Sequence, residues 1–135
     1  MTALLDIAGL SVNFPVTGGL FDALIPGRRR YIDVLDGISM SLNSGETLGL
    51  VGESGSGKSV TNLAIMGLIP QPPGRIPKGR AMFQQQDLLT MNRRQLSKIR
   101  GDRIAMIFQD PMTALNPFLT VEEQLTEVTR LHRGY

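Results

Sequence analysis

The chain reads Gly52-Glu53-Ser54-Gly55-Ser56-Gly57-Lys58-Ser59, which matches the phosphate-loop pattern G-x-x-x-x-G-K-[ST] at every fixed position. Its glycines permit backbone angles closed to other residues, so consecutive amides can point inward and form an anion nest. Lys58 can then reach the β- and γ-phosphates, and the Ser59 hydroxyl can ligate Mg²⁺. The loop therefore predicts binding of a nucleoside triphosphate, without saying which one.

The segments on either side of the loop fit this interpretation. Residues 47–51 form a short apolar run, as expected for a strand buried on both faces. A helix is expected over 58–68, ended by Pro70, and its N-terminus would favour phosphate. The alternative is a glycine-rich turn without a ligand, which the agreement of loop, strand and helix disfavours.

The N-terminal part has the pattern of two half-buried strands. In residues 4–14, apolar side chains alternate with Ser11 and Asn13, and a second alternating stretch covers residues 31–42. Residues 15–30 contain proline, glycine and three arginines and are interpreted as an excursion off the core. A turn is expected at 43–46.

Beyond the loop, prolines and glycines in 70–79 predict a further loop, with a possible strand over 80–86. Asn92 and Gln95 form a capping box, which predicts a helix over 93–100.

The last part of the chain is expected to hold one more strand and one more helix. Residues 104–108 are apolar and predict a second buried strand. Thr120 and Glu123 form another capping box, followed by apolar residues at helical spacing to about Arg130.

Composition excludes several classes of protein. The 135 residues are 41% hydrophobic and 19% charged, as in an ordinary globular domain. No apolar run approaches the ~20 residues of a bilayer span, and the N-terminus lacks the basic start of a signal peptide. Cysteine is absent, so there are no disulfides, and a net charge of +2 gives no reason to expect a nucleic-acid partner.

Two stretches resemble the ATPases of ABC transporters. Residues 45–59 look like their Walker A region, and Ile107-Phe108-Gln109-Asp110-Pro111-Met112-Thr113-Ala114-Leu115-Asn116-Pro117 resembles their Q-loop region. The form Gln-Asp-Pro-Met-Thr-x-Leu-Asn-Pro is similar to that of dipeptide and oligopeptide importers. The resemblance covers residues 4–135. It implies an α/β fold, with a partial P-loop NTPase core and an N-terminal antiparallel β region.

The resemblance also implies roles for single residues. Gln109 matches the glutamine that senses Mg²⁺ and the attacking water, so it joins Lys58 as a catalytic residue and Ser59 as a metal ligand. Phe14 matches the aromatic residue that stacks on adenine, although it can equally be core, and Tyr31 is its rival. Residues 111–118 match the stretch facing the membrane subunit, or form a plain surface loop. The implied nucleotide-binding set is Phe14, Gly52, Glu53, Ser54, Gly55, Ser56, Gly57, Lys58, Ser59 and Val60.

For function, the resemblance implies the ATP-binding subunit of a peptide importer, which uses ATP and Mg²⁺. It would lie peripherally on the cytoplasmic face of the membrane, with membrane-spanning subunits and a second ATP-binding subunit as partners. Residues 1–135 would be the N-terminal part of one nucleotide-binding domain, because the signature, Walker B and switch-histidine motifs of the family do not occur in them. Such a chain alone is not expected to hydrolyse ATP.

Two other functions stay open: a non-catalytic nucleotide-binding remnant, and another soluble P-loop NTPase such as a small kinase. We also expect Leu48, Leu50, Ile104 and Ile107 to be exposed without the strand that carries the Mg²⁺-binding acid.

Overall fold

The computed structural model describes residues 3–16, 30–108 and 115–133, and the chain divides into two compact units, Met1–Met91 and Asn92–Tyr135. The first unit contains β1 (Leu5–Pro15), β2 (Tyr31–Leu42), α1 (Lys58–Ile65), β3 (Arg75–Phe83) and β4 (Gln86–Asp87). The second contains α2 (Arg93–Ile99) and α3 (Val121–Arg133).

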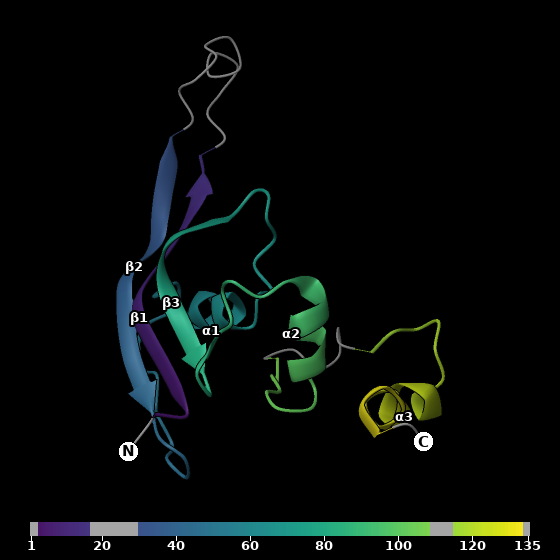
Figure 1. Cartoon of the computed structure of the whole chain (residues 1–135). Helices are drawn as coiled ribbons and strands as arrows, with labels where there is room; N and C mark the ends of the chain where they lie inside the picture. The colour runs from purple at the N-terminus through teal and green to yellow at the C-terminus, as the bar shows by residue number, and fades with distance from the viewer. Residues whose placement is uncertain (1–2, 17–29, 109–114, 134–135) are drawn as a thin grey trace. The chain divides into compact units, whose positions relative to one another are not determined.

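The first unit is built on an antiparallel sheet with the strand order β2-β1-β3-β4 (Figure 1). The two strands predicted at 4–14 and 31–42 are confirmed, and so is the helix at the phosphate loop, although α1 ends at Ile65 rather than at residue 68. β1 lies between β2 and β3 and is therefore the most buried strand. The buried apolar residues of this unit are Ile7, Leu10, Val12, Leu35, Ala64, Ile65, Met66, Ile69, Ala81, Phe83 and Leu88.

The simple alternation predicted for β1 is interrupted, because Ser11 is buried rather than exposed. Its hydroxyl accepts a hydrogen bond from the Gly37 amide at 3.0 Å, and the Ser39 hydroxyl accepts one from the Gly9 amide at 2.9 Å. The register between β1 and β2 shifts on both sides of the Leu10–Ile38 pair. The two serines thus satisfy amides that the irregular ladder leaves unpaired.

The loop predicted over residues 70–79 is correct only in its first half, because β3 begins at Arg75. Its residues pair with β1, for example Lys78 with Ser11. β4 pairs only with Met82 and Phe83, so none of the described strands pairs with the outer edge of β3 around Pro77. Proline is tolerated on such an edge, and pairing with the central strand overrides the turn signal.

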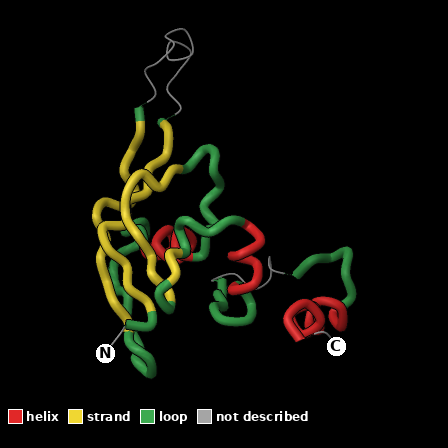
Figure 2. The backbone as a smooth tube through the Cα atoms, in the orientation of Figure 1, coloured by secondary structure: helices red, strands yellow, loops and turns green. Residues whose placement is uncertain are grey.

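The strand predicted at 47–51 is wrong. These residues have no regular structure, as the tube in Figure 2 shows. Val51 is 94% exposed. A strand buried on both faces needs neighbouring strands and covering helices, and no strand of the described residues pairs with this segment. The expected exposure of Leu48 and Leu50 is confirmed.

The strand predicted at 104–108 is wrong for the same reason. Ile104 makes only an isolated bridge with Arg100 and is half-buried rather than exposed, whereas Ile107 is 96% exposed as expected. An apolar run indicates that a segment can be buried, but the pairing partner has to come from elsewhere in the chain.

Both predicted capping boxes are confirmed. At α2, the Gln95 amide donates to Asn92 Oδ1 at 3.0 Å, and the Asn92 amide donates to Gln95 Oε1 at 2.9 Å. At α3, Thr120 and Glu123 make the corresponding pair at 2.9 and 3.2 Å. Hydrogen bonds from the backbone and then the side chain of Thr120 lower the pKa of Glu123, because they stabilise its carboxylate.

The helix predicted from Val121 is confirmed and continues to Arg133. Its periodic apolar side chains are all exposed: Val121, Leu125, Val128 and Leu131. No helix among the described residues is long and apolar enough to cross a bilayer.

The hairpin between β3 and β4 turns through two residues with unfavourable backbone angles, Gln84 (φ 47°) and Gln85 (φ 68°). We expect Gln85→Gly to raise the free energy of unfolding by roughly 0.5–1 kcal/mol. Glycine adopts a left-handed backbone conformation without strain, and this gain outweighs the extra backbone entropy that glycine gives to the unfolded chain. Urea unfolding of the full chain measures this change. Gln86→Gly, one residue further in β4, is the matched control and should destabilise; equal effects of the two changes would contradict the explanation.

Candidate nucleotide-binding site

The phosphate loop follows the irregular segment 47–51 and leads into α1. No side chain makes a capping hydrogen bond at the N-terminus of this helix. The Ser56 amide donates to the Glu53 carbonyl at 3.2 Å and closes a tight turn. Gly55 (φ 83°) and Gly57 (φ 91°) have the backbone angles that the sequence predicted for them. Because no side chain caps α1, its first amides remain available to an anion.

Gly52, unlike Gly55 and Gly57, does not have a positive φ. A Cβ atom on this residue would lie 2.6 Å from Ser56 Oγ and 3.8 Å from Lys58 Nζ. These neighbours are side-chain atoms, so the side chains of Ser56 and Lys58 converge on Gly52 at the mouth of the loop.

Lys58 is folded back over the loop. Its Nζ atom donates to the carbonyls of Gly52 and Glu53 at 2.7 Å each, and it lies 3.2 Å from Ser56 Oγ. These contacts hold the ammonium at the mouth of the loop, where a phosphate oxygen can replace one of them. Ser54 and Ser59 are exposed, and Val60 is half-buried.

The inner side of the loop rests on β2 and α1. A Cβ atom on Gly57 would lie 2.6 Å from Leu35 Cδ2 and 3.4 Å from the Val34 carbonyl. Thr61, which is only 2% exposed, donates its hydroxyl to the Gly57 carbonyl at 2.9 Å. The sequence analysis predicted neither contact. Leu35 is distant from Gly57 in the chain and could not be identified, whereas a threonine four residues after the helix-capping glycine could have been.

Phe14 and Tyr31, the two candidates for adenine, are placed differently. Phe14 is half-buried, and its Cε1 atom lies 2.9 Å from where a Cβ on Gly74 would be. The guanidinium of Arg75 lies 4.7 Å from the centre of the Tyr31 ring and covers one of its faces. Tyr31 pairs with Pro15, the neighbour of Phe14, so the two aromatic side chains point to opposite faces of the sheet.

Gln109 lies outside the described residues, as does the first half of the 111–118 stretch. In the second half, Leu115 is 59% exposed and Phe118 is 93% exposed. Asn116 is held by Gln124 of α3, which donates to its carbonyl at 3.1 Å and accepts from its amide at 2.9 Å. Sequence reasoning did not single out Gln124.

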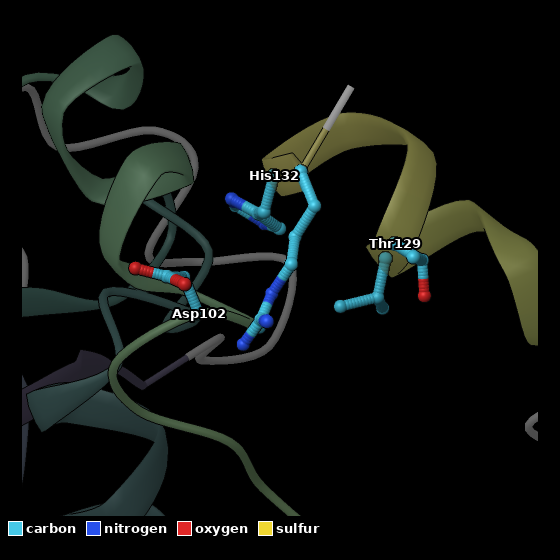
Figure 3. A pocket seen from close by; sticks show the side chains of 6 residues that line it. Asp102, Thr129 and His132 are labelled. Carbon is cyan, nitrogen blue, oxygen red and sulfur yellow. The ribbon is translucent and has the colours of Figure 1, made fainter. Parts of the chain in front are cut away.

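Each unit contains a hollow lined by described residues. One of about 200 Å³ lies in the first unit beside residue 47–51 and α1, lined by Leu5, Met40, Ser41, Leu42, Leu48, Leu50, Asn62 and Ile65. The other, of about 380 Å³, is lined by Gly101, Asp102, Val128, Thr129, His132 and Arg133. Figure 3 shows Thr129 and His132 entering it from α3, and Asp102 from the turn after α2. No predicted site residue lines either hollow, and no described cluster of three or more His, Cys, Asp or Glu side chains could hold a metal.

A glycine-rich loop with an inward lysine, ahead of an uncapped helix, defines a phosphate-binding loop of the P-loop class. The sequence model of the ABC transporter family matches residues 35–133, and the chain therefore belongs to that family.

Several named relatives are similar to the chain over nearly its whole length. It is 43% identical to the oligopeptide transport ATP-binding protein OppD of Bacillus subtilis over 98% of this chain and 34% of that protein. It is 44% identical to OppD of Haemophilus influenzae over 100% of this chain and 38% of that protein. It is 43% identical to the dipeptide transport ATP-binding protein DppD of Bacillus subtilis over 98% and 36%. The chain thus spans about a third of the length of these relatives.

Proposed function

We propose that this chain supplies the phosphate-binding part of an ATP-binding subunit that powers peptide import. The observation that carries the proposal is the closed loop in which Lys58 Nζ is held 2.7 Å from two loop carbonyls, ahead of an uncapped helix. Membership of the ABC transporter family and the names of the relatives support the same function. Residues 1–135 are then the N-terminal part of one nucleotide-binding domain.

The nucleotide would be ATP, held by the loop from Gly52 to Val60. The amides of Glu53, Ser54 and Gly55 would be the loop donors for phosphate oxygens, together with those at the start of α1. Lys58 adds a positive charge. Ser59 would hold Mg²⁺, which supplies charge neutralisation at the phosphates when bound. Gln109 would complete the metal site and help to orient the attacking water, as the resemblance implies.

Phe14 is the better candidate to stack on adenine. Phe14 Cε1 and Ile69 Cγ2 both lie within 3 Å of the position that a Cβ of Gly74 would take, so Phe14 faces the segment that follows the loop helix α1. Tyr31 points to the other face and is already covered by Arg75. Stacking on an aromatic ring would orient the base without distinguishing it strongly.

The partners would be membrane-spanning subunits and a second ATP-binding subunit, with the chain at the cytoplasmic face of the membrane. The exposed apolar residues Leu115 and Phe118 lie in the stretch that the resemblance assigns to the membrane subunit. An exposed apolar stretch of this kind is expected at a protein interface.

Peptide uptake tests the whole proposal. We expect deletion of the encoding gene to stop growth of an amino-acid auxotroph when the required amino acid is supplied only as short peptides. Growth on the free amino acid should be unaffected, and the intact gene should restore peptide use, whereas the same gene with Lys58→Ala should not. Normal growth of the deletion strain on every peptide tested, in a background without other peptide importers, would contradict the peptide assignment.

A further inference from the structure

The buried side of the phosphate loop carries a polar contact to which no role has yet been given. The Gly57 carbonyl accepts two hydrogen bonds from Thr61, one from the backbone amide at 2.8 Å and one from the hydroxyl at 2.9 Å. Both lone pairs of this carbonyl are thus occupied by one residue. Thr61 is 2% exposed, so water does not compete readily for either bond.

This contact fixes the orientation of a peptide group that faces the nucleotide site. The Gly57 carbonyl and the Lys58 amide belong to one planar trans peptide, so they point in opposite directions. Turning the carbonyl toward Thr61 in α1 turns the Lys58 amide away from the helix and toward the loop. Gly57 has no Cβ to resist rotation, and its other side is closed by Leu35.

We propose that Thr61 is a positioning residue for the phosphate loop: its buried hydroxyl holds the Gly57–Lys58 peptide with the N–H directed at the bound phosphate. The inference rests on the proposed ATP-binding function and adds a residue that would touch neither nucleotide nor metal. It acts through Gly57 and sets the angle at which the first helical amide meets the anion.

A purely structural role is the competing explanation, because threonine hydroxyls often bond to the carbonyl four residues back in a helix. Thr61→Val distinguishes the two. Valine keeps the branched shape, and the backbone amide still satisfies the Gly57 carbonyl, so only the second, orienting bond is lost. Thr61→Ser keeps the hydroxyl and removes a methyl group. Thr61→Ala is a second variant without the hydroxyl.

The experiment is a titration of the full chain with a fluorescent ATP analogue, alongside thermal unfolding of each variant. We expect Thr61→Val to bind the analogue about 2- to 10-fold more weakly, with Thr61→Ser within about twofold of the wild type. Thr61→Ala should follow Thr61→Val. The loss of affinity should depend on whether the variant keeps a hydroxyl at position 61. It should not vary in parallel with the unfolding midpoint across the set.

Two results would overturn the inference: wild-type affinity in both Thr61→Val and Thr61→Ala, or a loss in Thr61→Ser as large as in Thr61→Val. Lys58→Ala, measured in the same series, separates this failure from failure of the proposed function. If Lys58→Ala weakens binding and the hydroxyl-free variants do not, only the role of Thr61 is rejected. If the wild type does not bind, or Lys58→Ala binds as tightly as the wild type, the phosphate-loop assignment is rejected as well.

Discussion

Replacing Lys58 with alanine should weaken ATP binding by roughly 2–5 kcal/mol, or about 30- to 5,000-fold in dissociation constant. The ammonium contacts two loop carbonyls at 2.7 Å and is already at the mouth of the loop, so little ordering is needed when a phosphate arrives. Alanine removes the positive charge that offsets the phosphates. It also removes the contacts that tie Gly52 and Glu53 to the start of α1.

The measurement is a competition titration, in which ATP displaces a fluorescent ATP analogue from the full chain. Lys98→Ala is the matched control, because it removes an exposed lysine in the last turn of α2 and should leave the affinity unchanged. The Lys58 contacts are solvent-exposed, so water can replace them and the unfolding midpoint should change little. Equal affinities for wild type and Lys58→Ala would exclude the phosphate loop as the binding site.

The parts of the fold that could be predicted from sequence are those set by neighbouring residues. The capping boxes at Asn92 and Thr120 are local patterns of side chain and backbone, and both formed as expected. The strands β1 and β2 are antiparallel neighbours, and the alternation in their sequences located them even though Ser11 and the register shifts interrupt it in the structure. Their bounds were therefore readable within one or two residues.

The wrong strand predictions have a different cause. Residues 47–51 and 104–108 are apolar enough for buried strands, but no strand pairing with them lies among the described residues. An apolar pattern indicates that a segment can be buried, whereas its actual burial depends on partners distant in sequence. The same limit applies at Arg75, where pairing with β1 extends β3 through a proline and a glycine.

The candidate site divides in the same way. The glycine pattern and Lys58 are a contiguous motif, so the loop could be located from eight residues. The resemblance favoured Phe14 over Tyr31, but the strand register and the Arg75 guanidinium that covers the Tyr31 ring could not be predicted from sequence. The contact between Leu35 and Gly57 could not be predicted from sequence either, since it joins residues on two different elements.

The largest stability loss is expected for Gly79→Ala in β3. Gly79 has φ 110°, and a Cβ there would lie 2.5 Å from the Leu10 Cα and 2.8 Å from its amide nitrogen. The obstacle is the backbone of the central strand, which cannot move aside as the end of a flexible side chain could. Backbone strain of about 1–3 kcal/mol and overpacking of similar size together predict a loss of roughly 2–6 kcal/mol in the free energy of unfolding.

Two other glycines separate the contributions to this loss. Gly45→Ala introduces a side chain at φ 80° with no atom within 4 Å, so it should show the backbone strain alone. Gly49→Ala has neither a positive φ nor a close neighbour and should be neutral or slightly stabilising. In urea unfolding, the free energy of unfolding should be lowest for Gly79→Ala, intermediate for Gly45→Ala and highest for Gly49→Ala. If Gly79→Ala cost no more than Gly45→Ala, β3 would not approach β1 at Leu10 as closely as described, and the register that joins them would be in error.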